Sequence, residues 1–341
     1  MFTASTLLAL SLACTPEEEP PVDVGDPAEE LALPDLTGTD WPAAYAEAIT
    51  VTAELRTALA WSGHDKALAL GREGCPDIYV GAPDEDLDVD EDAGGVSWSD
   101  YCETGGGLAF TGFSWWDGRA TVEGDAASPE GATATGERTM IADAVIADND
   151  GIRFQLDGEV SDALTRVDAE GYSRWTWSSL IQGSLTGADV FTGTATPGGI
   201  RADLYLYASG GDVEYMEARG DVYLFEEPVL GRFDSISMDL AMIEPRSAGP
   251  EDCAEEPLGY LSLRDTDAYW YDLVFLPRYD ENATDEDYPN NPYGECDGCG
   301  TLYVRGLEQG EVCVDFSFLW EGALSPPDIE DFVTSLRLVS Q

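Results

Sequence analysis

Met140-Ile-Ala-Asp-Ala-Val-Ile-Ala-Asp-Asn-Asp-Gly-Ile-Arg-Phe-Gln-Leu-Asp-Gly-Glu-Val160 is the stretch of sequence that decides the fold. After Asp148-Asn-Asp-Gly151, apolar residues alternate with polar or small ones from Ile152 to Val160, and the segment before it, 140–147, is rich in apolar residues. This period of two is typical of a β-strand that buries one face. Asn and Gly tolerate the positive φ angles of tight turns, so the Asp148–Gly151 segment favours a chain reversal. The stretch therefore predicts a β-hairpin, with strands over 140–147 and 152–160.

The same pattern recurs along most of the chain after Cys75. Turn signals at Thr196-Pro-Gly-Gly and Ser209-Gly-Gly-Asp separate several of the repeated segments. Further strands are expected over 172–180, 200–207, 213–225, 236–243, 269–276, 302–305, 312–319 and 336–339. One hairpin after another predicts an all-β fold, mostly an antiparallel meander, arranged as a sandwich or as a large twisted sheet.

Helical signals are confined to the two ends of the folded region. Residues 41–60 are rich in alanine, Asp40 is a suitable N-cap, and Pro42 is tolerated in a first helical turn. A short helix is also expected over 327–334. These elements suggest a helix plus β-rich domain over 39–245. A proline-rich acidic segment at 246–257 then begins a C-terminal, disulfide-containing β region, 246–341, packed on that domain.

The charge of the chain excludes one class of partner. Asp and Glu number 68 against 16 Lys and Arg, which gives a formal net charge of -52. Such a field repels phosphate backbones and anionic lipid headgroups, so we expect no nucleic-acid binding. Cationic or carbohydrate partners remain open, and the acids also favour solubility in a salty environment.

The N-terminus carries an export signal. An apolar run from Leu7 to Ala13 is too short to span a bilayer and is typical of a signal peptide, here residues 1–13. The run ends at Ala13-Cys14, which resembles the lipobox of bacterial lipoproteins. That resemblance implies acylation of Cys14, so the lipid is the only expected contact with a membrane. Residues 14–38 are acidic and proline-rich, and we expect an extended tether.

The resemblance also bears on where the protein is held. In enteric lipoproteins an Asp directly after the acylated cysteine favours the inner membrane, and this chain has Thr15 there. The expected location is therefore the outer membrane, on its periplasmic face or at the cell surface. In its acidic tether and cysteine layout the chain is similar to uncharacterised lipoproteins of myxobacteria and their relatives, a resemblance that implies no particular activity.

Six further cysteines predict three disulfides, because an even number is typical of exported chains. Cys75 and Cys102 lie far from the others in sequence and are expected to pair. The connectivity among the remaining four is left open by the sequence; they are Cys253, Cys296, Cys299 and Cys313. The Cys296-Asp-Gly-Cys299 motif precedes a segment with strand character. Because redox motifs of this spacing begin a helix, we expect structural half-cystines.

Few residues suggest chemistry. His64 is the only histidine and is expected on the surface, in a turn after the first helix. No nucleotide-binding or metalloprotease motif is present. Alternating acids at Asp84, Asp86, Asp88, Asp90 and Asp92 offer calcium ligands, but in a register that differs from an EF-hand. We therefore expect either weak calcium binding or a solvated acidic loop, and no other cofactor.

Aromatic residues are the other candidate binding surface. Trp175 and Trp177 share one side of a predicted strand, as do Tyr205 and Tyr207, and Trp115-Trp116 adds more rings. Exposed rings would stack on sugars or basic peptides, whereas buried rings would belong to the core. Two functions follow: a non-catalytic binding or structural module of the cell envelope, or a carbohydrate-active enzyme or carbohydrate-binding protein.

Overall fold

The computed structural model describes residues 36–55, 109–124, 131–149, 152–169, 172–187, 199–211, 214–224, 230–244, 256–275 and 298–317, with residues 34 and 319 and short pieces between residues 60 and 103. The chain divides into two units, Met1–Asp35 and Leu36–Gln341. The helix and all the described strands belong to the second unit.

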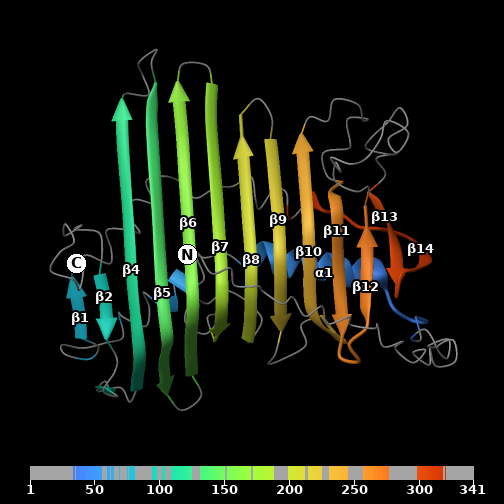
Figure 1. The fold of residues 1–341 in the computed structure, drawn as a ribbon, viewed down its shortest axis with the longest axis horizontal. Coiled ribbons are helices and arrows are strands. Elements are labelled where there is room, and N and C mark those ends of the chain that lie inside the picture. Colours follow the sequence, from blue (N-terminus) through green and yellow to red (C-terminus); the bar gives the residue numbers. More distant parts are fainter. Residues whose placement is uncertain are drawn as a thin grey trace, which may run out of the picture. The chain divides into compact units, whose positions relative to one another are not determined.

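The second unit is built around one large antiparallel sheet (Figure 1). Its strands follow in spatial order β1-β2-β4-β5-β6-β7-β8-β9-β10-β11-β12-β13-β14, and β3 pairs with β4. The strands are β1 (Asp77–Val80), β2 (Gly94–Ser97), β3 (Cys102–Glu103), β4 (Ala109–Gly124), β5 (Ala132–Asn149), β6 (Ile152–Ala169), β7 (Tyr172–Thr186), β8 (Gly199–Gly210), β9 (Glu214–Leu224), β10 (Phe233–Glu244), β11 (Leu258–Asp265), β12 (Trp270–Val274), β13 (Cys299–Val304) and β14 (Leu307–Cys313). From β4 to β14 each strand pairs with its neighbours in sequence, so the sheet is an open meander.

The all-β prediction is confirmed, and the arrangement is a single open sheet. The deciding hairpin is β5 with β6, where Asn149 lies opposite Ile152. The strand expected over 312–319 instead ends at Cys313. The expected elements at 327–334 and 336–339 lie outside the described residues. Across the proposed boundary at 246–257 the sheet continues, because β10 pairs with β11.

One face of the sheet holds the core. Strand alternation places one set of side chains on this face, and a row of them crosses β5 to β8: Met140, Val160, Ile181 and Leu204, all buried. On β8 buried and exposed residues alternate along the strand. Burial on one side only is usual for antiparallel sheets. We call this side the covered face and the opposite side the open face.

The helix α1 (Trp41–Glu54) packs on the covered face. Asp40 caps it as predicted, because its carboxylate accepts a hydrogen bond from the Ala43 N–H at 3.2 Å. The Tyr45 hydroxyl donates to the Tyr271 carbonyl of β12 at 2.8 Å, and the Trp41 ring lies 5.0 Å from the Tyr271 ring. These contacts fix the helix against the C-terminal half of the sheet.

Glycine is required where Gly158 of β6 faces Gly183 of β7. Gly158 lies opposite Gly183, with φ angles of 127° and 154°. A Cβ on either residue would lie 2.1 Å from a carbonyl oxygen of the facing strand. Glycines within strands commonly mark such close approaches and bends. Any side chain at either position would push the two strands apart.

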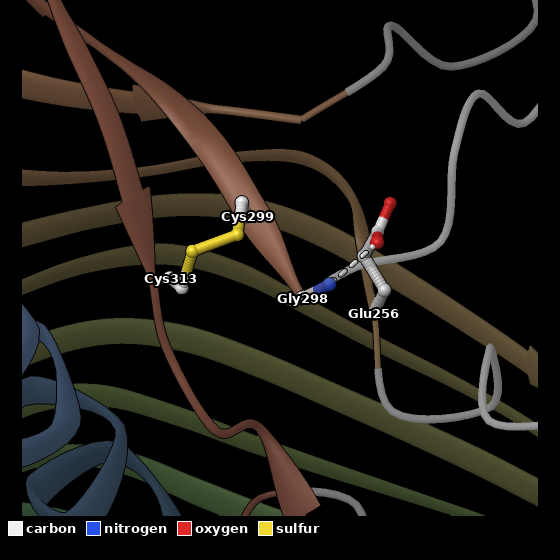
Figure 2. The surroundings of a disulfide bond; sticks show 4 residues. All are labelled: Glu256, Gly298, Cys299 and Cys313. Carbon is white, nitrogen blue, oxygen red and sulfur yellow. Dashed lines mark hydrogen bonds between the residues drawn. A yellow bond between two sulfur atoms is a disulfide. The ribbon is translucent and has the colours of Figure 1, made fainter.

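Two disulfides lie within the described residues. Cys75 pairs with Cys102, which confirms the prediction, and Cys299 pairs with Cys313. The second bond joins directly opposite residues of β13 and β14. Figure 2 shows it beside the buried Glu256, whose carboxylate accepts a hydrogen bond from the Gly298 N–H at 3.0 Å. Cys253 and Cys296 lie outside the described residues.

Candidate functional site

The open face of the sheet keeps aromatic side chains in contact with solvent. Tyr205 on β8 is 37% exposed and Tyr223 on β9 is 39% exposed, whereas the rings on the covered face are mostly buried. Phe113 and Ile141 are also exposed on the strands β4 and β5. Large apolar side chains that stay exposed together can mark an interaction surface. The open face is therefore the candidate site.

A hollow of about 460 Å³ lies on this face between Trp115 of β4 and Tyr205 of β8. Strand register brings its lining together. One row of paired residues crosses the sheet from β4 to β8: Asp117, Thr139, Ser161, Leu180 and Tyr205. Glu137, Ala163 and Ser178 line the next row. The hollow thus has a ring at each end and hydroxyl and carboxylate groups between them.

The Tyr205 end of the hollow is held by its neighbours. Arg219 lies opposite Tyr205 on β9 and forms ion pairs with Glu217 at 3.0 Å and with Asp239 at 3.3 Å. Partial burial, with a smaller contribution from Glu217, raises the pKa of the Tyr205 phenol above its ordinary value. The phenol therefore stays protonated at neutral pH and can donate a hydrogen bond to a ligand.

Two further hollows lie on β6–β9. One of about 380 Å³ is lined by Thr165, Arg174, Thr176 and Tyr207, among others. The Tyr207 ring lies 6.0 Å from that of Tyr215 on β9. The other hollow, of about 530 Å³, is lined by polar groups and by Tyr223: Gln182, Arg201, Asp203 and Asp221. Polar, partly aromatic surface thus extends over several strands.

The tryptophans singled out from the sequence lie on the covered face. Trp177 is 2% exposed and belongs to the core, and Trp175 is half-buried and packs against it. The ring of Trp175 lies over Gly210 of β8, where an added Cβ would approach it to 2.4 Å. Trp177 is therefore not available to a ligand, whereas Trp175 is among the residues that line the hollow of about 380 Å³.

His64 is buried, which corrects the expectation of a surface turn. Its side chain has 0% exposure, and its Nε2 lies 2.7 Å from the Ser114 hydroxyl. The sheet places a buried ion pair nearby on the same face, in which the Arg138 Nε donates to Asp162 at 2.9 Å. The Arg138 guanidinium also lies over the Trp61 ring, at 4.8 Å. Ser114 and His64 are both fully buried, so this serine–histidine pair is not part of the exposed surface of the described structure.

The other predicted site residues fall outside the described part of the chain. These are Cys14 and the five aspartates Asp84, Asp86, Asp88, Asp90 and Asp92. Among the residues that the structure does describe, no group of three or more His, Cys, Asp or Glu is placed to hold a metal ion. Within the same residues, no helix has the length and apolar character needed to cross a membrane.

The sequence did not single out the polar lining of the hollow. Asp117, Glu137, Thr139, Ser161 and Ser178 come from four strands, and each is an ordinary polar residue in an alternating pattern. The usable signal was the tandem Trp115-Trp116, because consecutive strand residues face opposite sides. One of the two rings had to lie off the core, and it is Trp115.

Comparison of the chain with models of known protein families, with curated proteins and with solved structures finds no match.

Proposed function

We propose that this protein is a cell-envelope lipoprotein whose folded region is a non-catalytic binding module, with the hollow between Trp115 and Tyr205 on the open face as its binding site. One observation carries the proposal: the open face keeps partly exposed rings around a polar hollow, while the opposite face forms the core. Rings on a solvated sheet face are available for stacking on a ligand. A purely structural sheet would not need them there.

Placement in the envelope rests on the N-terminal sequence. The apolar run that ends at Ala13-Cys14 supports export and acylation, and the acidic tether would hold the binding module away from the lipid. A single acyl chain binds a bilayer only weakly, so stable anchoring through Cys14 would need more than one chain or a second signal.

Cys14→Ser tests this placement. The variant should lose its acyl groups and leave the membrane fraction, whereas Thr15→Ser keeps Cys14 and should remain in it. Cell fractionation and intact-protein mass spectrometry measure both effects. Unchanged mass and fractionation of the Cys14 variant would contradict the anchoring proposal.

Binding by the open face is tested with the full chain purified in detergent. We expect it to sediment with the isolated cell-envelope fraction of its own cells, and Tyr205→Ala should weaken this association. Tyr260→Ala is the matched control, because Tyr260 is equally exposed on β11 but does not line the hollow. Equal behaviour of the two variants would argue against the hollow as the binding site.

A carbohydrate-active enzyme is the second candidate, favoured by the carboxylates in the hollow. Asp117 and Glu137 are diagonal neighbours on adjacent strands, a relation that separates Cα atoms by about 7–8 Å. Glycosidases use two carboxyl groups roughly 5–10 Å apart, a range that two side chains on one face of such neighbours can span. Release of reducing ends from a polysaccharide, lost in Glu137→Gln and Asp117→Asn, would favour the enzyme over the binding module.

A further inference from the structure

We propose that the open-face hollow binds an uncharged glycan chain laid across strands β4 to β8, with one sugar ring stacked on Trp115 and another on Tyr205. This inference rests on the proposed function and names the ligand class and its direction on the sheet.

The dimensions of the hollow favour an extended ligand. Trp115 and Tyr205 lie on strands that are four positions apart in the sheet. Neighbouring strands are about 4.8 Å apart, so the two rings are separated by about 19 Å across the strands. A single small molecule would not contact both rings, whereas a short oligosaccharide lying perpendicular to the strands would.

The groups between the two rings match the surface of a sugar. Thr139, Ser161 and Ser178 offer hydroxyls that donate and accept, and Asp117 and Glu137 offer carboxylate oxygens that accept from hydroxyl donors. Apolar faces of sugars stack on aromatic rings while their hydroxyls point outward. The hollow supplies a ring for stacking at each end and hydroxyl and carboxylate groups between them.

A row of hydroxyls runs in the same direction on the same face. Register aligns Thr121, Thr135, Thr165, Thr176 and Ser209 across strands β4 to β8. The four threonines are exposed, and the hydroxyls of Thr121 and Thr135 lie 2.7 Å apart. Hydroxyls that repeat about every 4.8 Å, the spacing between strands, can form hydrogen bonds with a polymer whose own hydroxyls repeat at regular intervals. Thr165, Thr176 and Ser209 line the neighbouring hollow, so the polar surface continues beyond Tyr205's row.

Charge decides between glycan classes. The net charge of -52 repels uronic-acid and sulfated polymers, which leaves uncharged chains. A cationic ligand is disfavoured at the Tyr205 end, because Arg219 already pairs with the carboxylates of Glu217 and Asp239 there. The uncharged glycan is therefore the occupant that fits the rings, the hydroxyls and the charges together.

Affinity electrophoresis of the full chain in detergent tests the ligand class. The gels contain one soluble polymer each: hydroxyethyl cellulose, xyloglucan, galactomannan or laminarin as uncharged glycans, alginate as a polyanion, and polylysine as a cationic peptide. We expect at least one uncharged glycan to retard the protein and alginate to leave its mobility unchanged. Trp115→Ala and Tyr205→Ala should each weaken that binding roughly three- to tenfold.

The matched variants are Tyr205→Phe, which keeps the ring and should retain most of the affinity, and Tyr260→Ala, which should retain all of it. Circular dichroism of each variant verifies folding, and a variant that unfolds is replaced by Trp115→Leu or Tyr205→Leu, which also remove the ring. Retardation by polylysine alone, or by no uncharged glycan while the envelope fraction still binds, overturns the glycan inference and leaves the binding module standing. Loss of binding to both the glycans and the envelope fraction overturns both proposals.

Discussion

Asp162 and Arg138 form an ion pair inside the covered face, where both side chains are almost completely buried. The Arg166–Asp168 pair has a similar separation, 2.8 Å, but 38% of each side chain is exposed. Removing one partner from a buried pair leaves the other charge without compensation, and water cannot replace it. An exposed pair loses little, because water screens both charges.

We therefore expect Asp162→Asn to lower the free energy of unfolding by about 3–5 kcal/mol. Asp168→Asn should lower it by less than about 1 kcal/mol. Denaturant unfolding followed by tryptophan fluorescence measures both changes. Similar losses in the two variants would show that the buried pair is not the more important one.

His64 shows that the burial of a single residue is hard to predict from sequence. Its immediate neighbours, Gly63 and Asp65, favour a turn, and the sequence gives no sign of burial. The burial comes from Ser114, which is 50 positions away, and from the Trp116 ring at 5.9 Å. Contacts at such separations depend on the register of the sheet, which a local pattern does not contain.

The strands themselves were easier to predict than their boundaries. Strands β5 to β10 combine local alternation with clear turn signals, so their existence followed from short windows. β4 was not expected, because Gly112, Gly118 and the tandem Trp115-Trp116 interrupt its alternation. β11 was also not expected, because it directly follows the acidic proline-rich segment 246–257, which was interpreted as a domain boundary. The sequence could not predict which residues line the hollow, because they are brought together by the register of five strands.

The disulfides give a prediction about pairs of strands. Cys75–Cys102 and Cys299–Cys313 account for four of the six cysteines, so Cys253 and Cys296 should pair with each other. Non-reducing peptide mapping should recover all three links and no free thiol. Cys299→Ser together with Cys313→Ser should lower the free energy of unfolding by about 3 kcal/mol, the value expected for a disulfide that closes a loop of about 15 residues. Bound zinc or free thiols at Cys296 and Cys299 would contradict this assignment.

The net charge of -52 makes the folded chain repel itself, so screening ions should stabilise it. At physiological ionic strength the screening length is about 8 Å, so neighbouring carboxylates still repel one another whereas distant ones hardly interact. Melting temperatures should therefore rise smoothly with sodium chloride, by roughly 2–4 °C for each kcal/mol gained. Thermal unfolding monitored by circular dichroism over a salt series measures this rise.

Calcium should add a further increase at millimolar concentration, because the aspartates from Asp84 to Asp92 are clustered in sequence. Changing Asp86, Asp88 and Asp90 to Asn should reduce the calcium effect and leave the sodium effect in place. Saturation at micromolar calcium would instead reveal a dedicated site. A melting temperature that changes with neither sodium chloride nor calcium would mean that the charge affects solubility and not stability.

The pairing of each strand from β4 to β14 with its sequence neighbours has a consequence for how the molecule acquires its structure. Short loops close at low entropic cost, and contacts between nearby segments form early. A nascent chain can add one strand at a time to the edge left by the strand before it. Until the next strand arrives, that edge presents unpaired backbone that invites pairing with other chains. The last described strand, β14, is joined to β13 by the Cys299–Cys313 disulfide, so a covalent bond holds this end of the described sheet in place.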